Sequence, residues 1–445
     1  MSETGLSGNP LFNLPHELGD GLVIQQATKT DIDAVVDFIV RIHGDPVLGV
    51  SARDLMCGDH PTTSADDFVL VVDSRAKSRI VALAGLLSQF WAYEDISFGV
   101  GNPEFIATDP AYRRRGLMRA VMDGLHLLSA SRGDLVQGIQ GLRWFYRQFG
   151  YEYALDPGPR CQLDLSDIAP LPDGDTEPYQ IRRVTEADIP SITPLYRRQC
   201  AGYMITVVLD EEIRRHDISG YSPGADLGDW TYSVTDHDGR FVGYYSTWGD
   251  PWGAFMIKEL AATNDEELRH VLPSVLRFIQ SQRVTYDTEF EDEGPTAIKF
   301  ELGTSHPAYK ILDTKLGQLQ PRQDWYIRAP DLPKFILHIA PVLEQRLATS
   351  GMGSFTGGLK MTFFQGGLQL VFDQGKLSQV TNWRADGDDV FNGTGFPPLI
   401  FLKLLFGYRS LEELCYAYPD CWANEQDTQL LNALFPKQPS WLRML

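Results

Sequence analysis

Three consecutive arginines, Arg113 to Arg115, precede Gly116 at the start of a helical pattern. Residues 104–108 predict a strand before this turn, and apolar residues recur on one helical face after it. A glycine lets a ligand approach the backbone, and the unpaired N–H groups and dipole of a helix N-terminus favour an anion. We therefore predict a phosphate-binding turn; the alternative is an arginine-rich loop that only faces solvent. The apolar positions are Leu117, Val121, Leu125 and Leu128.

A tyrosine that can act as a proton donor follows downstream, in the aromatic segment 144–151. A tyrosine has a pKa of about 10 and a thiol one of about 8.5, so a positioned Tyr146 hydroxyl can protonate a leaving thiolate. The alternative is that Tyr146 is one more core aromatic. His126 lies in the middle of the predicted helix, and we expect it to be structural.

A second aromatic group, residues 91–95, reads Trp-Ala-Tyr-Glu-Asp. Its rings and carboxylates suit a bound cation. The favoured interpretation is the exposed end of a hairpin, with an aromatic and acidic wall for an amine as the alternative.

The composition limits the class of protein and its partners. The 445 residues predict two to four domains, with a formal net charge of −20. This charge argues against nucleic acid or an anionic membrane as partner, because either requires a basic face, and it suits a cationic small molecule. The five scattered cysteines show neither zinc-site spacing nor a disulfide framework. With no signal-peptide pattern at 1–19, we expect a cytoplasmic protein without a metal.

An internal repeat organises the rest of the chain. Residues 24–32 are echoed by 181–189, so that Thr28 aligns with Thr185 and Asp31 with Asp188. In the second copy the segment 260–267 stands where the phosphate-binding turn falls in the first. It has acids but neither arginine nor glycine, and we expect the second copy to have lost the ligand.

The fold class is predicted as α/β followed by α+β. Mixed strands and helices surround the phosphate-binding turn, whereas the last part has strands at 359–363 and 368–370 and helices near 399–406 and 411–416. The expected division is an N-terminal tail at 1–20, a catalytic domain at 21–168, a degenerate second copy at 169–329 and a third domain at 330–445.

The motif Arg113-x-x-Gly116 between a strand and a helix resembles the acetyl-CoA signature of the GNAT superfamily of N-acetyltransferases. Residues 145–151 are similar to that family's aromatic motif. Met118 departs from the pattern, since the family has a glycine or alanine there. The tandem copies and the third domain together resemble the Eis-type ("enhanced intracellular survival") acetyltransferases, which end in a sterol-carrier-like domain. The fold implied is a pair of GNAT domains, each with a mixed central sheet flanked by helices, plus a sterol-carrier-like α+β domain.

The resemblance implies site residues for acetyl-CoA as cosubstrate. Tyr146 matches the proton donor, and the C-terminal carboxylate of Leu445 matches the proton acceptor, although the family usually ends in an aromatic residue. Three groups of positions match coenzyme contacts: the strand beside the pantetheine arm, the pyrophosphate turn and a later contact. These positions are Ile106, Ala107 and Thr108; Arg114, Arg115, Gly116, Leu117, Met118 and Arg119; and Gly141 and Leu142.

The function expected is acetyl-CoA-dependent N-acetylation of a primary amine by direct attack on the thioester. The acceptor expected is a cationic small molecule or a lysine-bearing peptide. The resemblance also implies a homo-oligomer such as a hexamer. The alternative is a non-catalytic protein that binds coenzyme A or a lipid.

Overall fold

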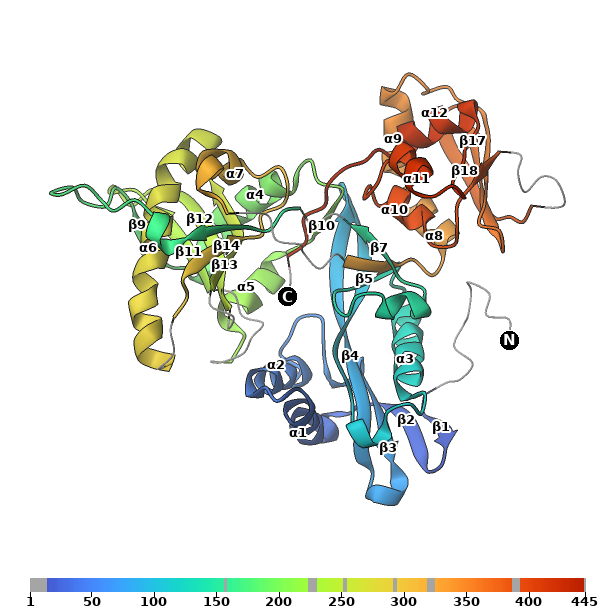
Figure 1. Ribbon diagram of the computed structural model, residues 1–445, viewed down its shortest axis with the longest axis horizontal. Helices are drawn as coiled ribbons and strands as arrows, with labels where there is room; N and C mark the ends of the chain where they lie inside the picture. The colour runs from blue at the N-terminus through green and yellow to red at the C-terminus, as the bar shows by residue number, and fades with distance from the viewer. Residues whose placement is uncertain are drawn as a thin grey trace. The chain divides into compact units, whose positions relative to one another are not determined.

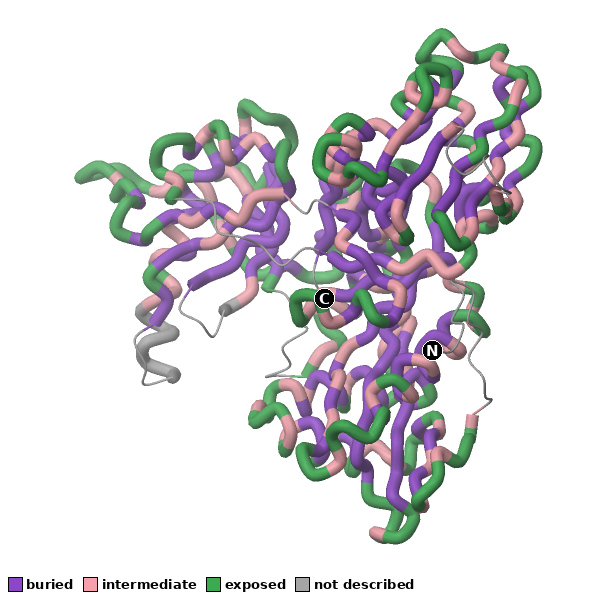
Figure 2. Tube along the Cα trace, turned by 45° about the vertical axis from the view of Figure 1, so that its right-hand side comes forward, coloured by how far each residue is buried: buried purple, intermediate pink, exposed green. Residues whose placement is uncertain are grey.

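The computed structural model describes residues 14–155, 158–222, 230–250, 254–290, 294–317, 325–385 and 393–443. The chain divides into two compact units. The first unit is Met1–Asp156 with Gln323–Pro439, and the second is Pro157–Arg322 with Ser440–Leu445. Figure 2 shows that buried residues follow the strands, whereas exposed residues gather in the connections. Within the described ranges, no helix is both long and apolar enough to cross a membrane.

The first unit has a mixed sheet built from β1 (His16–Gly19), β2 (Leu22–Gln26), β3 (Phe68–Asp73), β4 (Arg79–Tyr93), β5 (Ile96–Thr108), β6 (Val136–Ile139), β7 (Glu152–Leu155) and β15 (Trp325–Arg328). The strand order is β1-β2-β3-β4-β5-β6-β15-β7, and β5 with β6 is its parallel pair. Two helices, α1 (Ile32–His43) and α2 (Pro46–Met56), lie on one face of this sheet, and α3 (Leu117–Arg132) lies on the other (Figure 1).

These elements confirm the α/β class and the predicted helix after the phosphate-binding turn. The strand predicted at 104–108 is the last part of β5, which begins at Ile96 and forms a long hairpin with β4. The segment expected as a tail, 1–20, contributes β1, which pairs with β2.

Two strands belong to a different sheet from the one that the predicted domain boundaries would give them. β15 is a strand of the first sheet, although the expected boundaries place it in the second domain. It fills the space between β6 and β7 and satisfies backbone groups of both, with Tyr326 opposite Ile139 on one side and Tyr153 on the other. β8 (Cys161–Asp164) pairs instead in the sheet of the second unit. The three-domain division itself stays a prediction.

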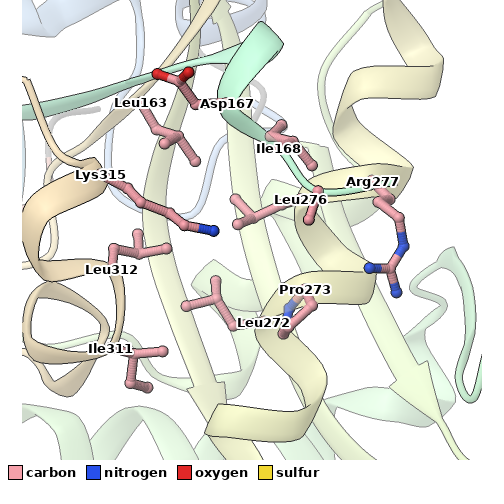
Figure 3. Close-up of a pocket in the computed structure, with 11 residues that line it drawn as sticks. Leu163, Asp167, Ile168, Leu272, Pro273, Leu276, Arg277, Ile311, Leu312 and Lys315 are labelled. Atoms are coloured by element: carbon pink, nitrogen blue, oxygen red, sulfur yellow. The ribbon is translucent and has the colours of Figure 1, made fainter. Parts of the chain in front are cut away.

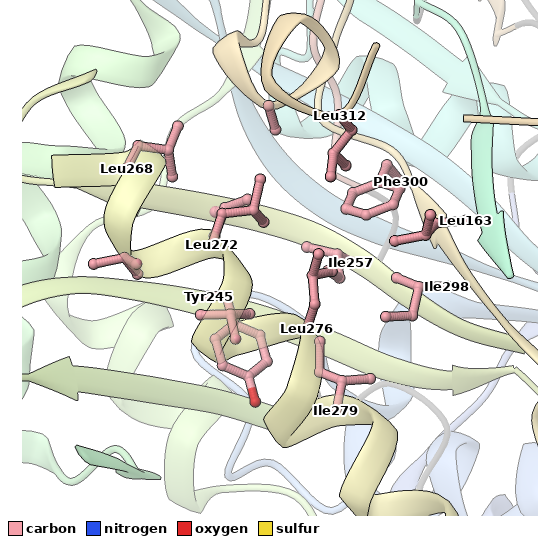
Figure 4. Close-up of a cluster of buried hydrophobic side chains, with 14 of the residues drawn as sticks. Leu163, Tyr245, Ile257, Leu268, Leu272, Leu276, Ile279, Ile298, Phe300 and Leu312 are labelled. Atoms are coloured by element: carbon pink, nitrogen blue, oxygen red, sulfur yellow. The ribbon is translucent and has the colours of Figure 1, made fainter. Parts of the chain in front are cut away.

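The second unit has a sheet in the order β8-β14-β13-β12-β11-β9. Its helix α6 packs one apolar side onto the strands (Figure 4). Leu272 and Leu276 of α6 meet Ile257 and Phe300 in this core, which is closed to water. The remaining bounds are β9 (Gln180–Arg183), β10 (Ile205–Val207), β11 (Trp230–Thr235), β12 (Phe241–Asp250), β13 (Ala254–Ala262), β14 (Ala297–Phe300), α4 (Ile189–Cys200), α5 (Glu211–Ser219), α6 (Asp265–Phe290) and α7 (Pro307–Leu312).

The sequence repeat corresponds to a structural repeat. In both copies a strand is followed by a short 3-10 turn and a helix, β2–α1 in the first and β9–α4 in the second. Both turns carry the same capping box: the Asp31 carboxylate accepts the backbone N–H of Thr28, and the Asp188 carboxylate accepts that of Thr185. The repeated residues are therefore those that start a helix.

The C-terminal part of the first unit is α+β, as predicted. Its sheet has the order β18-β17-β16-β19, and helices cover one side of it (Figure 1). The strands predicted at 359–363 and 368–370 are confirmed by β16 and β17. The assignment to a sterol-carrier-like domain stays a prediction. The bounds are β16 (Gly357–Thr362), β17 (Gly367–Asp373), β18 (Lys376–Asn382), β19 (Thr394–Gly395), α8 (Leu332–His338), α9 (Ala340–Thr349), α10 (Phe401–Leu405), α11 (Leu411–Ala417) and α12 (Glu425–Leu434).

Leu272→Ala tests the α6 core. Removing a buried leucine side chain loses transfer free energy and leaves a cavity, so we expect a loss of about 2–5 kcal/mol in the free energy of unfolding. Urea denaturation followed by circular dichroism measures the change. Leu337→Ala is the control, because Leu337 is 43% exposed. Equal losses in the two variants would contradict the assigned core.

Candidate active site

The strand β5 carries a bulge opposite β4. Leu83 pairs with Ala107 and Gly85 with Glu104, so Phe105 and Ile106 stand opposite a single residue of β4. Phe105 has φ +55°, and its ring packs against Phe68 at 5.8 Å between centroids. A bulge bends its strand and increases the local twist. It therefore turns the end of β5 away from the regular ladder.

Just before this bulge, the pairing between β5 and β6 ends. Their parallel ladder contains only Val100 with Val136 and Gly101 with Gln137, although β5 continues to Thr108. From 102 to 108, no described strand pairs with the β5 edge that faces β6. An extended ligand with amide groups can add to such an open edge as an extra strand does. Three of the predicted coenzyme contacts lie here: Ile106, Ala107 and Thr108.

The predicted phosphate-binding turn connects this edge to α3. Asp109 begins it: its Oδ1 accepts the Ala111 N–H at 3.0 Å, and its Oδ2 pairs with Arg41 at 3.0 Å and with Arg79 at 2.7 Å. Arg114 then has φ +63°, and Gly116, the residue just before the helix, has φ +79°. No side chain caps the first turn of α3. Its backbone N–H groups are thus available to an anion.

The side chains of the turn separate into two sets. Leu117 is buried and Met118 is partly buried, and both pack on the core of the first sheet, so they offer only backbone groups to a ligand. Arg113 and Arg114 are exposed, and neither has a partner among the residues that the structure describes. Met118 stands at the motif position where the family has a small residue, and its side chain points to the core.

Two further arginines are held by weak contacts at the same place. Arg115 lies 3.4 Å from an Asp20 carboxylate oxygen, and its guanidinium lies over the Tyr112 ring. Arg119 donates to Gln148 at 3.2 Å and lies over the Phe149 ring. Both guanidinium groups are on the surface, where such pairs contribute little and can be exchanged for a phosphate.

Tyr146 lies in the 3-10 turn η5 (Phe145–Phe149), and its side chain is 5% exposed. Its ring meets Phe145 edge-on at 5.2 Å and Tyr326 of β15 at 5.6 Å between centroids. A Cβ added to Gly141 would lie 2.9 Å from Cε2 of Tyr146, so the glycine makes room for the ring. The hydroxyl has no hydrogen-bond partner among the described residues. Burial, followed by the charge of Glu104, raises the pKa of Tyr146, which keeps the phenol protonated.

Glu104 is a residue that the sequence analysis did not select. It precedes the bulge of β5, and the Asn102 side-chain amide donates to its Oε1 at 3.3 Å. Burial raises the pKa of the Glu104 carboxyl from its ordinary value of 4.5 to about 7, which the Asn102 hydrogen bond opposes. Its charge also acts on Tyr146. A carboxyl with a pKa near neutrality is suited to accept a proton from a substrate. The only signal in the sequence was a carboxylate within an apolar strand.

The other predicted positions have mixed outcomes. Leu142 is 68% exposed, and its carbonyl accepts the Tyr326 hydroxyl at 3.5 Å. The aromatic wall considered at 91–95 is contradicted, because Trp91 and Tyr93 are fully buried and pack on Trp325 and Phe335. The favoured interpretation is confirmed, because β4 ends at Tyr93, β5 begins at Ile96, and the turn residues Glu94 and Asp95 are exposed. His126 is structural in the described fold: it is buried beside the Tyr151 hydroxyl at 3.0 Å, and burial holds its pKa well below 6.5.

Leu445 lies outside the described residues. The tail before it belongs to the second unit, where the Trp441 indole donates to the Glu301 carbonyl at 3.2 Å. Arg443 is buried between Asp217, at 2.5 Å, and Glu259, at 3.3 Å. The role of the terminal carboxylate thus stays a prediction.

The second unit offers no comparable anion site at α6. The Asn264 side chain accepts the Glu267 N–H at 2.8 Å, and three acids occupy the first turn, so this N-terminus is capped and negative. A cavity of about 180 Å³ lies further along the helix, between α6 and α7 (Figure 3). Its walls are mostly apolar, and the Lys315 amine reaches into it.

The raised pKa of Glu104 gives a prediction on stability. Because the folded state binds this proton more tightly than the unfolded chain, the contribution of Glu104 to stability falls as the pH rises from 4.5 to about 7. Glu104→Gln removes this dependence. We expect the free energy of unfolding of Glu104→Gln, relative to that of the wild type, to rise by about 3 kcal/mol between pH 4.5 and pH 8. Urea titrations at both pH values measure the difference, and a pH-independent difference would contradict the prediction.

Comparisons with known proteins agree with this geometry. Residues 23–154 match the family model described as Acetyltransferase (GNAT) domain. No curated protein sequence matches the chain. The fold is similar to that of a probable N-acyltransferase from Enterococcus faecalis V583, at 15% identity over 95% of this chain and 99% of that chain, with a TM-score of 0.65.

Two further solved structures have the same architecture. A GCN5-related N-acetyltransferase from Anabaena variabilis is 13% identical over 95% of this chain and 99% of that chain, with a TM-score of 0.63. Eis1 from Mycobacterium abscessus is 15% identical over 94% of this chain and 98% of that chain, with a TM-score of 0.56. Residues 23–154 thus have the fold of a GNAT acetyltransferase domain, and nearly the whole chain shares its architecture with these proteins.

Proposed function

We propose that the chain is an acetyl-CoA-dependent N-acetyltransferase that acetylates a primary amine by direct attack on the thioester. The observation that carries the proposal is a meeting of three features in one GNAT-fold domain. These are the open edge of β5, the uncapped N-terminus of α3, and the Tyr146 phenol, whose pKa is raised by burial and by the charge of Glu104.

The first two features form the proposed binding site for the coenzyme. The backbone of Ile106, Ala107 and Thr108 offers hydrogen bonds to the amides of the pantetheine arm. The N–H groups of the first turn of α3, with Arg114 and Arg115, face the diphosphate. Gly141 borders the Tyr146 ring, and the next residue, Leu142, accepts the Tyr326 hydroxyl; in this proposal both complete the contacts near the thioester end.

The chemistry requires one proton donor and one proton acceptor. Acetyl-CoA supplies an activated acyl group as a thioester. Glu104 accepts a proton from the amine, whose nitrogen forms the new bond to the acetyl carbon. Tyr146 donates its proton to the sulfur as the carbon–sulfur bond breaks. The donor remains protonated at neutral pH because its pKa is raised, and the acceptor is close to half ionised.

Glu104 is favoured over the terminal carboxylate as acceptor for an electrostatic reason. A terminal carboxyl has an ordinary pKa of about 3.5, far below that of an ammonium group near 10. The Glu104 carboxyl, with a pKa of about 7, reduces this mismatch in proton affinity by several powers of ten. The C-terminal carboxylate, which the Eis-type resemblance implies, is the alternative.

The acceptor proposed is the primary amine of a cationic compound such as a polyamine, an aminoglycoside or a lysine peptide. The net charge of −20 supports this choice, because it favours the approach of cations. We extend the proposal to a cytoplasmic homo-oligomer with a sterol-carrier-like third domain. Light scattering of the purified protein tests the oligomer.

An amine panel tests the proposed function. The full chain is mixed with acetyl-CoA, one amine at a time and a thiol reagent that reports free coenzyme A. Thiol release that depends on the amine supports the transferase. Coenzyme binding without release for any amine would favour a protein that only binds coenzyme A or a lipid.

Tyr146→Phe tests the proton donor. The ring and its packing are kept while the hydroxyl is lost, so we expect kcat to fall by about 10²-fold or more, with the Kd for acetyl-CoA within about twofold. Steady-state kinetics and calorimetry measure the two quantities. Tyr416→Phe is the matched control, because Tyr416 is 92% exposed. Unchanged kcat in Tyr146→Phe would remove the hydroxyl from the mechanism.

The two candidate acceptors are separated by pH profiles. In the wild type, kcat/KM should rise with pH through about 7, because Glu104 must be ionised. Glu104→Gln should lower kcat/KM at pH 7 by about 10²-fold and remove this step, leaving only the ionisation of the amine. Deletion of Leu445 should leave the profile unchanged. The reverse pattern would assign the proton to the terminal carboxylate.

A further inference from the structure

A lysine is buried within the otherwise apolar helix α10. Lys403 is 5% exposed, and the other four residues of the helix are buried apolar side chains. An ammonium group removed from water is costly unless it is paired and hydrogen-bonded. Burial lowers the pKa of Lys403, and the charge of Glu152 opposes this. The cost of burying this ammonium group therefore depends on the contacts that the amine makes.

Both hydrogen-bond partners of the Lys403 amine are on β7. Nζ lies 3.0 Å from Oε1 of Glu152 and 2.8 Å from the Tyr153 carbonyl oxygen. Glu152 is itself 6% exposed. Burial alone would raise the pKa of Glu152, but hydrogen bonds from Arg147 and the charge of Lys403 outweigh it and hold the pKa below its ordinary value. The carboxylate is thus the centre of a buried ionic cluster.

The third member of the cluster is the residue that follows Tyr146. Arg147 donates from Nε to Oε2 of Glu152 at 3.0 Å and from Nη2 to Oε1 at 2.7 Å. This two-pronged contact fixes a planar guanidinium more firmly than a single bond does. One carboxylate thereby attaches the η5 turn to α10, two segments that lie more than 250 residues apart in sequence.

A stack of rings connects the same cluster to the Tyr146 side chain. The Arg147 guanidinium lies 5.4 Å from the Tyr153 ring centre, and the Tyr153 ring is stacked on Tyr326 at 3.8 Å. Tyr326 meets the Tyr146 ring edge-on, and its hydroxyl accepts the Trp144 N–H at 2.5 Å. Tyr326 of β15 thus packs against the Tyr146 ring. The Tyr146 backbone precedes Arg147, which the Glu152 carboxylate holds in place.

We propose that Lys403 is a positioning residue for acetyl transfer, which acts through Glu152 and Arg147 to hold the Tyr146 hydroxyl in place. The inference rests on the proposed function and extends the site to the C-terminal α+β part of the chain. Lys403 contacts no reacting atom. Its effect is therefore expected in turnover, because small displacements of a catalytic group cost large factors in rate.

The test is a double-mutant cycle between Lys403→Met and Tyr146→Phe. Methionine keeps the length of the side chain and removes its charge. In the wild-type background we expect Lys403→Met to lower kcat about tenfold, with KM for acetyl-CoA within about twofold. In the Tyr146→Phe background the same change should lower kcat less than about twofold, because the hydroxyl it positions is absent. Equal factors in both backgrounds, or no effect of Lys403→Met, would overturn the inference.

Three further proteins complete the test. Lys403→Arg keeps the charge and should restore most of kcat, whereas no recovery would count against the ionic contact. Lys376→Met is the matched control, because Lys376 pairs with Glu344 at 2.8 Å on the surface of the same part of the chain, and it should have wild-type kcat. If thermal unfolding shows that Lys403→Met does not fold, Glu152→Gln takes its place in the cycle with the same expected factors. A wild-type chain without transferase activity would refute the proposed function before any variant is compared.

Discussion

The candidate site depends on the separation of two neighbouring parallel strands. A strand buried in a sheet normally has its N–H and C=O groups paired on both sides. In β5 the pairing with β6 stops at Gly101, and the bulge at Phe105 bends the strand away from its regular course. Glu104 lies within the open edge that this break leaves, just before the bulge. A regular ladder to Thr108 would leave no backbone groups for an extended ligand.

The parts of the site that were predictable from the sequence are local. The phosphate-binding turn was predictable because Gly116 and the start of the helix are adjacent in sequence. The positive φ of Arg114 was not, since a residue with a Cβ rarely adopts it. The capping boxes at Thr28 and Thr185 are local in the same way as the turn. The existence of the strands and helices was accordingly predictable, although the lengths of β4 and β5 were not, since pairing between distant residues determines them.

The parts that were missed depend on contacts that are distant in sequence. Glu104 has a raised pKa because of burial, which the neighbouring residues do not reveal. Lys403 meets Glu152 only through the tertiary fold, and a lysine between two leucines gives no sign of its partner. Residues 91–95 were correctly predicted as a hairpin end, but the burial of the Trp91 and Tyr93 rings was missed for the same reason. These rings are buried by packing on Trp325 and Phe335, and no periodicity in the sequence indicates this packing.

The position of β15 within the first sheet has a consequence for synthesis of the chain. β7 joins this sheet only through β15, which emerges from the ribosome about 170 residues later. At the usual rates of translation this delay is roughly 10 to 35 s. During that interval β7, which carries Glu152, has no neighbouring strand in this sheet, while residues 157–322 of the second unit are being made. The first sheet is therefore completed only after residues 157–322 of the second unit have been synthesised, and the turn that carries Tyr146 gains its neighbour Tyr326 at that late stage.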